Sequence, residues 1–273
     1  MASADTTLLG RVPTLSVPAL NRLFAVYTAL VILTLLLPLA YILPISLHPD
    51  GLAAIPTDPT LKWYGQLLAN DSLLSALSIS VQLAAATAVI TTPLAFLAAA
   101  GTRNAARTDA LIGLFLLPVF MPGISVGLGL AVYFELLGIP LSPMTALVAH
   151  VLWAFPFAYI IILTTMASFD THLKEAAYDL GAREWRAFVD VELPQIQPGI
   201  IGAAMFSFTL SFNEFSRTML VRGSTDTLPT YVLSRVQNLG IDPTVYAVSG
   251  LTIVVSTLLL LAISYSAINN ANE

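Results

Sequence analysis

Two carboxylates, Glu135 and Glu214, stand inside long apolar stretches of this chain. An ionisable side chain at the centre of a membrane-spanning helix costs about 2.5–3.5 kcal/mol on insertion scales, so its presence there indicates a functional site by default. A carboxylate attracts a cation, and aromatic faces attract ammonium groups. We therefore predict that a small cationic solute passes along a path lined by six residues: Tyr133, Glu135, Trp153, Phe212, Asn213 and Glu214.

Each of these residues also has a plainer explanation. Glu214 can pair with Arg217, which follows three residues later and would share its face of a helix. Glu135 can be exposed at the membrane interface, and the aromatic side chains can serve in ordinary packing. Both alternatives stay open on the sequence alone.

The chain contains one pattern typical of covalent catalysis, which we do not assign as a catalytic site. Gly123-Ile-Ser125-Val-Gly127 matches the G-x-S-x-G motif of serine hydrolases, and His150 follows on the next apolar segment. That motif needs a turn from a strand into a helix, whereas here it lies within a membrane segment. His48, His150 and His172 are too dispersed for a zinc site, so no metal ligand is predicted either.

The composition indicates a membrane protein. Of 273 residues, 57% are hydrophobic and 10% are charged, against about 25% charged in an ordinary soluble domain. The net charge of −5, without a basic cluster, argues against nucleic-acid binding. The absence of cysteine excludes a disulfide framework.

Six apolar stretches meet or approach the length of about 20 residues that a helix needs to cross a bilayer. We predict an all-α membrane protein whose six transmembrane helices cover Leu23–Ser46, Leu73–Ala100, Leu111–Leu137, Met144–Ala167, Gly199–Leu220 and Val245–Ala267.

The basic residues orient these helices, because Lys and Arg in short loops stay on the cytoplasmic side. An amino terminus inside places seven of the eleven basic residues there: Arg11, Arg22, Arg103, Arg107, Lys174, Arg183 and Arg186. Both termini are then cytoplasmic. We divide the chain into a cytoplasmic arm (1–22), a transmembrane domain (23–268) and a cytoplasmic tail (269–273).

The cytoplasmic loop over residues 168–196 is too long for a simple connection. Asp170 or Thr171 can cap a first helix, and Gly181 can supply the left-handed residue that ends it. A second helix is predicted over Arg183–Asp190, with Pro194 stopping its continuation. Such a unit can dock a partner protein. The alternative, an interfacial helix pair in the lipid headgroups, is disfavoured because acidic residues outnumber basic ones here.

This loop carries a recognisable signature. Glu175-Ala176-Ala177, then Gly181, then Val191-Glu192-Leu193-Pro194 resembles the EAA-x3-G-x9-I-x-L-P motif of permease subunits of binding-protein-dependent ABC importers. The resemblance implies a type I importer permease fold, in which the loop is a coupling-helix pair that inserts into a cleft of a cytoplasmic ATPase. The coupling residues it implies are Glu175, Ala176, Ala177, Gly181, Leu193 and Pro194.

The carboxyl-terminal third resembles the second permease subunit of spermidine/putrescine-type importers, through Phe208–Phe215, Val221–Gly223, Thr227–Tyr231 and Asp242–Ser249. The resemblance implies import of a polyamine or related organic amine across a prokaryotic inner membrane. It implies four kinds of partner: a homologous second permease, two ATPase subunits, an extracytoplasmic solute-binding protein and membrane lipid.

ATP and magnesium are expected on the ATPase subunits, because this chain lacks a G-x-x-x-x-G-K-[ST] phosphate loop. No cofactor and no covalent catalysis are expected in the chain itself. The main alternative is a secondary transporter or channel that works without an ATPase. It is disfavoured because such proteins often contain inverted repeats, which we do not find here, and have no need of the 168–196 loop.

Overall fold

The computed structural model describes residues 17–50, 55–56, 58–103, 105, 108–240, 243–254 and 257. The chain divides into two compact units, one made of Met1–Leu67 with Asp242–Glu273 and the other of Leu68–Ile241. Every regular element among the described residues is a helix. The all-α prediction is therefore confirmed for this part of the chain.

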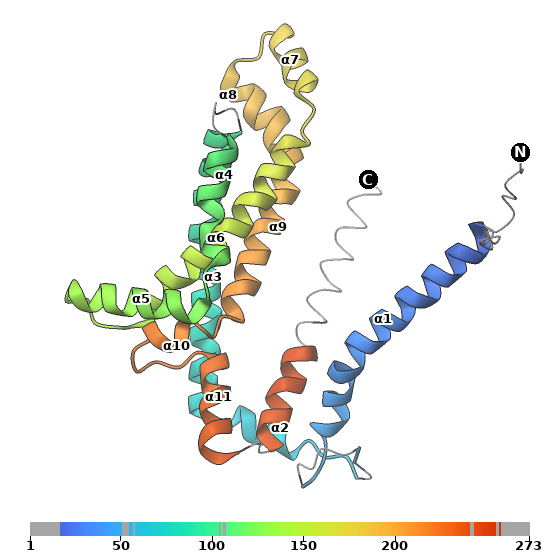
Figure 1. Cartoon of the computed structure of the whole chain (residues 1–273), viewed down its shortest axis with the longest axis vertical. Helices are drawn as coiled ribbons and strands as arrows, with labels where there is room; N and C mark the ends of the chain where they lie inside the picture. The colour runs from blue at the N-terminus through green and yellow to red at the C-terminus, as the bar shows by residue number, and fades with distance from the viewer. Residues whose placement is uncertain are drawn as a thin grey trace, which may run out of the picture. The chain divides into compact units, whose positions relative to one another are not determined.

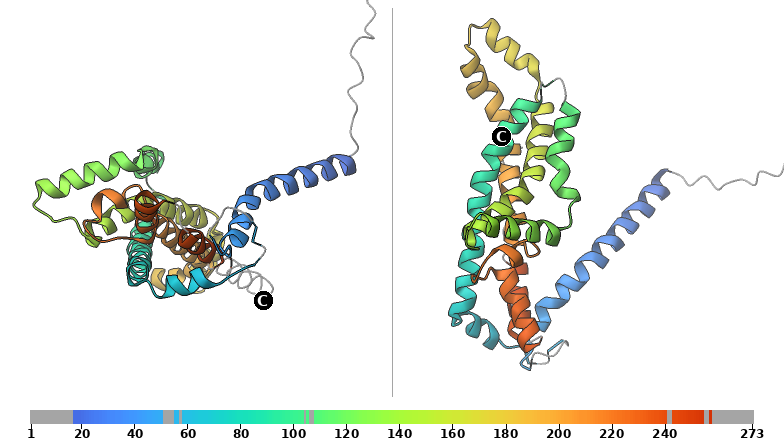
Figure 2. Two further views of the ribbon diagram at one scale, coloured as in Figure 1. Left: turned by 90° about the horizontal axis from the view of Figure 1, so that it is seen from below. Right: turned by 60° about the vertical axis from the view of Figure 1, so that its left-hand side comes forward.

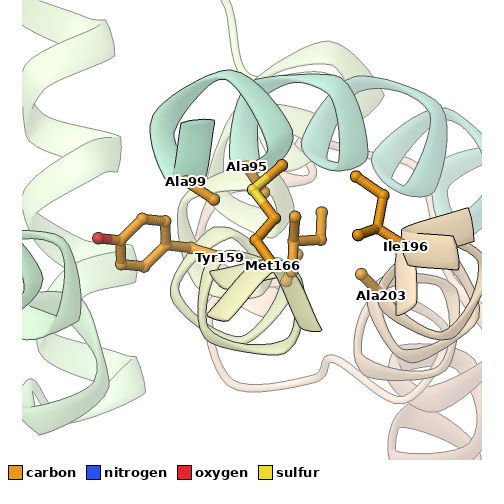
Figure 3. Close-up of a cluster of buried hydrophobic side chains, with 8 residues drawn as sticks. Ala95, Ala99, Tyr159, Met166, Ile196 and Ala203 are labelled. Atoms are coloured by element: carbon orange, nitrogen blue, oxygen red, sulfur yellow. The ribbon is translucent and has the colours of Figure 1, made fainter. Parts of the chain in front are cut away.

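Three long helices form the centre of the larger unit: α3 (Asp71–Thr102), α6 (Pro143–Ala167) and α9 (Leu193–Phe212). They lie side by side along most of their length (Figures 1 and 2). Their common core combines four alanines with four larger side chains (Figure 3): Ala95, Ala99, Ala158, Tyr159, Ile162, Met166, Ile196 and Ala203. Lipid tails are as apolar as leucine, so small side chains that let backbones approach closely stabilise such contacts.

The third predicted span is not one helix. The chain over 111–137 forms α4 (Thr108–Leu116), a 3-10 turn η1 (Leu117–Phe120) and α5 (Gly123–Leu136), with a bend of 94° between the two parts. Pro118 and Pro122 explain the break, because each lacks a backbone N–H and disfavours helical geometry in the preceding residue. Met121, which precedes Pro122, is accordingly extended, with ψ of 132°.

The fifth predicted span, Gly199–Leu220, was wrong at both ends. Helix α9 begins at Leu193 and ends at Phe212, and two further helices follow, α10 (Thr218–Val221) and α11 (Leu228–Leu239). The chain turns after Asn213 because the Glu214 carboxylate accepts the backbone N–H of Arg217 at 2.9 Å. Helices α10 and α11 lie at the opposite end of the α3–α6–α9 bundle from α7 (Thr171–Asp179) (Figures 1 and 2).

The smaller unit contains α1 (Val17–Ile45), nearly all of α2 (Lys62–Leu68) and a helix over Pro243–Val254. Ser46 Oγ and Tyr64 OH share a hydrogen bond of 2.7 Å. Gly250 lies against both side chains, since a Cβ there would come within 2.7 Å of the Tyr64 hydroxyl. These close contacts join three segments that are distant in sequence.

By length and composition, three described helices can cross a membrane, Leu20–Ile45, Asp71–Thr102 and Pro143–Ala167, and the bent pair α4–α5 can make a fourth. Their bounds agree within a few residues with the first, second and fourth predicted spans. The amino-terminal arm before residue 17, Arg107, the sixth span beyond Val254 and the carboxyl-terminal tail are predictions that lie outside the described residues, apart from residue 257.

Gly199 provides a test of the α6–α9 packing. A Cβ at this position would lie 2.6 Å from the Cβ of Thr165 on α6, whereas a Cβ at Gly202, one turn later on α9, would meet nothing within 4 Å. Both Gly→Ala changes gain helix propensity of about 1 kcal/mol, but overpacking at 199 costs about 1–3 kcal/mol. We expect Gly199→Ala to lower the thermal unfolding midpoint of the detergent-solubilised protein and Gly202→Ala to leave it equal or higher. Equal midpoints for the two variants would contradict the packing.

Candidate functional site

The first helix of the 168–196 loop forms as the sequence predicts. Asp170 caps α7, its carboxylate accepting the His172 backbone N–H at 3.0 Å. At the other end Gly181 has φ of +84°, in the left-handed region that favours glycine. The backbone N–H of Gly181 bonds to the Tyr178 carbonyl at 2.8 Å, and that of Ala182 to Ala177 at 2.9 Å. These bonds close the sharp turn that separates the two helical parts of the loop.

The loop presents uncovered apolar side chains. Leu180 is 90% exposed and Trp185 is 71% exposed, while Glu175 and Ala176 lie exposed on the same helical hairpin and Ala177 is half-buried. An open hollow of about 620 Å³ lies beside the turn, lined by Leu180, Gly181, Ala182, Arg183, Arg186, Ala187, Asp190 and Val191. Exposed large apolar groups beside a hollow are typical of a protein–protein contact surface.

The second half of the loop differs from the predicted helix over Arg183–Asp190. A short α8 (Glu184–Arg186) leads into a π-helix, η2 (Ala187–Glu192), which continues directly into α9. The Leu193 backbone N–H reaches back five residues to the Phe188 carbonyl. Pro194 therefore does not stop the helix as predicted. It occupies the first turn of α9, where its missing N–H is tolerated, and Leu193 packs against the α3–α6–α9 core.

A buried carboxylate connects this loop to the bundle. Glu192, at the end of η2, is 1% exposed and accepts hydrogen bonds from two cations. Lys174 of α7 donates at 2.9 Å, and Arg103, the C-cap of α3, donates to the other carboxylate oxygen. Burial disfavours the charged form of Glu192, but these two donors outweigh burial and hold its pKa below the ordinary value. The hydrogen bond to Glu192 likewise raises the pKa of Lys174.

The sequence analysis placed Arg103 and Lys174 on the cytoplasmic side but did not connect them with Glu192. One signal was available. Glu192 stands between Val191 and Leu193 at the start of a long apolar helix, a position where a carboxylate needs a partner. The cationic partners of Glu192 are distant from it in sequence, so the local pattern does not identify them.

At the other end of the bundle, the predicted path residue Glu214 is neutralised by its neighbour. Glu214 and Arg217 are both buried, with Glu214 Oε2 accepting from Arg217 Nη1 at 2.9 Å. The Arg217 guanidinium lies 3.9 Å from the centre of the Trp153 ring. On α5, Gly123 lies close to the guanidinium and Gly127 lies close to the Arg217 backbone. The pairing considered from the sequence is thus found, although the two residues lie in the turn between α9 and α10 and not on one helix face.

The other predicted path residues do not gather around this pair. Tyr133, Glu135 and Asn213 are exposed. The Asn213 amide donates to the Thr209 carbonyl at 3.0 Å, and Phe212 stacks on Phe208 with 6.1 Å between the ring centres. The solute path along all six residues stays a prediction.

His150 lies beside the Glu214–Arg217 pair in a buried polar network. Its two ring nitrogens are hydrogen-bonded to Ser211 at 2.6 Å and to Thr218 at 2.7 Å, and Ser211 donates to Thr87 of α3 at 3.1 Å. The network joins α3, α6, α9 and α10. Both nitrogens of His150 are therefore engaged away from Ser125, which is exposed on α5.

Solved structures with a similar fold come from ABC transporters. A bacterial alginate ABC transporter in complex with an alginate pentasaccharide-bound periplasmic protein matches with a TM-score of 0.63 at 18% identity, covering 89% of this chain and 93% of that one. An amino acid ABC transporter with histidines matches with a TM-score of 0.57 at 18% identity, covering 74% and 94%. The fold is that of a helical importer permease.

Residues 91–272 match the family described as binding-protein-dependent transport system inner membrane component, and this chain belongs to that family. The spermidine/putrescine transport system permease protein PotC of Escherichia coli K12 is 33% identical over 206 residues, which cover 74% of this chain and 78% of PotC. The putrescine transport system permease protein PotI of the same organism is 29% identical over 224 residues, covering 78% and 79%.

The buried ion pair generates a stability prediction. Removing one partner of a buried pair leaves an uncompensated charge and costs about 3–5 kcal/mol, whereas removing both leaves no charge behind. We expect Glu214→Gln to lower the thermal unfolding midpoint of the detergent-solubilised protein more than the double change Glu214→Gln with Arg217→Gln does. The single variant Arg217→Gln completes the comparison. If the decrease in unfolding midpoint of the double variant equals the sum of the decreases of the two single variants, the two side chains act independently and the prediction is wrong.

Proposed function

We propose that this chain forms one half of the translocation pore of an ABC importer for a polyamine or a related small organic amine. The observation that carries the proposal is the 168–196 loop, which folds as an exposed helical hairpin at one end of the bundle and turns at Gly181. Its EAA-type residues, Glu175, Ala176 and Ala177, all lie on α7. The similarity to PotC and PotI supports the amine as solute.

In this proposal the loop docks into a cleft of a cytoplasmic ATPase subunit. Alanines at 176 and 177 permit close approach of the partner, and Leu180 and Trp185 offer apolar area to bury. Closure of the ATPase dimer on ATP and magnesium then moves the hairpin, and the hairpin moves the helices of the bundle. The ATPase subunits hydrolyse ATP. This chain contributes the hairpin that is moved by them and holds no cofactor.

The complete assembly contains a homologous second permease, two ATPase subunits and an extracytoplasmic solute-binding protein, all set in membrane lipid. The second permease completes the pore around a pseudo-twofold axis, as closed assemblies favour. Placing the basic residues Lys174, Arg183 and Arg186 inside puts the 168–196 loop and both termini in the cytoplasm. The solute-binding protein then meets the face that carries α10 and α11.

Of the two predicted path carboxylates, one stays available to a cationic solute. Glu214 is already paired with Arg217, whereas Glu135 is exposed on α5 and forms no ion pair among the described residues. Tyr133, two residues earlier, is 56% exposed and offers an aromatic face. Glu135 is the entry contact we assign to the solute, because Tyr133, at this spacing on α5, faces a different side of the helix.

Docking through the loop predicts the effect of a single change at the turn. We expect Gly181→Asp to abolish co-purification of the ATPase subunit with this permease in mild detergent, because it strains the left-handed turn and adds a charge to the contact surface. The measurement is quantitative mass spectrometry of a pulldown from native membranes, with retention of the second permease as a check on folding.

Gly138→Asp is the matched control for this prediction. Gly138 also has positive φ, +67°, and a Cβ added there would meet nothing within 4 Å, as at Gly181, but it lies in the turn after α5. The control should retain the ATPase. If the wild-type chain brings down no ATPase in several mild detergents, the importer proposal fails and a secondary transporter takes its place.

The substrate class is tested on the solute-binding protein of the system, where recognition can be measured in solution. Ligands that bind only the folded state raise its unfolding midpoint by mass action. We expect spermidine, putrescine or a related organic amine to raise that midpoint in a thermal-shift panel. A panel in which sulfate, molybdate or a sugar raises it and no amine does would rule out the amine.

A further inference from the structure

The proposed docking surface gives no role to the ion network of Glu192 with Arg103 and Lys174. This network joins three elements: α7 through Lys174, η2 through Glu192 itself, and the C-cap of α3 through Arg103. Lys174 and Arg103 are each mostly buried, with 20% and 26% of their side chains exposed. The carboxyl end of α3, whose C-cap is Arg103, lies at the same end of the bundle as α7 (Figure 1).

The covalent chain gives the hairpin two direct attachments. Ser168 and Phe169 connect α7 to α6, and η2 connects α8 to α9. Helix α3 is far from the hairpin in sequence, so any movement reaches it through side chains. Movement can pass to α3 through its packing against α6 and α9. Two side-chain contacts among the described residues also join α3 or its C-cap to the hairpin itself: the ion network, and the ring contact of Phe96 on α3 with Phe188 in η2, whose centres lie 6.2 Å apart. Of these two contacts, the ion network is the one that includes a residue of α7, Lys174.

The energetics favour a rigid link over a loose surface contact. Exposed ion pairs contribute little to stability, because water solvates both partners. Glu192 differs because its carboxylate is buried and both of its oxygens are engaged, one by each cation. Losing either donor leaves a buried charge partly unsatisfied, so the three groups move together.

We propose that Glu192 is a positioning residue for transport, whose carboxylate locks the α7 coupling helix to the cytoplasmic end of α3 so that movement of the hairpin drives α3 directly. This inference rests on the proposed ATPase-driven import. It adds a component distinct from the docking surface, because the Glu192 side chain is buried inside this chain. Its loss should separate ATP hydrolysis from uptake while leaving the ATPase bound.

The test uses the complete transporter, reconstituted in proteoliposomes with its ATPases, second permease and solute-binding protein. For Glu192→Gln we expect the ATPase to co-purify normally and the ATP hydrolysed per solute imported to rise by about tenfold, in the range of typical coupling energies. Lys174→Met should raise the ratio in the same direction, and Lys174→Arg, which keeps the charge, should restore it. Combining Glu192→Gln with Lys174→Met should add little, because both remove one link.

Glu184→Gln is the matched control, since it neutralises an exposed carboxylate in the same hairpin, and it should keep the wild-type ratio. An unchanged ratio in Glu192→Gln and Lys174→Met, with the ATPase still bound, overturns this inference and leaves the importer proposal intact. Failure of the wild-type complex to bind an ATPase overturns the importer proposal instead. An equal rise in Glu184→Gln also overturns the inference, because it assigns the effect to hairpin charge in general.

A structural readout separates positioning from a simple loss of activity. This chain contains no cysteine, so Gly101→Cys on α3, where a side chain meets open space, and Asp179→Cys on α7 can carry a pair of spin labels as its only cysteines, in a complex whose partner subunits have been made cysteine-free. We expect one narrow distance distribution with Glu192 present and a broad one in Glu192→Gln. Equal widths would show that α7 and α3 are held together by other contacts.

Discussion

Close approach of backbones is the constraint on which the described part of the larger unit depends. Burying leucine between helices adds little stability in lipid, because the surrounding lipid tails are equally apolar. Helices α3, α6 and α9 instead meet through alanines such as Ala99, Ala158 and Ala203, which are fully buried, and through Gly199, which leaves room for Thr165.

Each end of the bundle buries a carboxylate, and each is neutralised in a different way. Glu214 pairs with a residue three positions later in its own segment, so the pair fixes the local turn between α9 and α10. Glu192 draws its two cations from other elements, so its network fixes how those elements sit together. A local pair shapes one segment, whereas a long-range network makes several segments act as one. The Glu214–Arg217 pair therefore suits a segment of fixed shape. The Glu192 network suits a part of the chain that transmits movement.

The comparison of sequence and structure separates what local pattern can specify from what it cannot. The bounds of α3 and α6 follow from hydropathy, and the cap at Asp170 and the turn at Gly181 follow from local backbone chemistry. The break at Met121 was missed because prolines inside a membrane helix are often tolerated, as Pro93 and Pro156 are here. Hydropathy measures how apolar a stretch is and carries no information on its direction.

The candidate site divides in the same way. The Glu214–Arg217 pair was foreseeable because the two residues are three apart. Arg103 and Glu192 are 89 positions apart, so only the packing of α3 against the start of α9 brings them together. The EAA-type motif located the hairpin, but the group that joins it to α3 lies at a variable position inside that motif's pattern.

The π-helix at 187–192 gives the spacing within the hairpin a mechanical meaning. Its hydrogen bonds span five residues where an α-helix spans four, so the segment holds more chain than an α-helical path over the same turns would need. Each residue of an α-helix advances the screw by about 100°, at 3.6 residues per turn. Removing one residue between Gly181 and Pro194 would therefore turn the hairpin about the α9 axis and carry Lys174 away from Glu192. The number of residues in this stretch therefore sets the angle of the hairpin about the α9 axis.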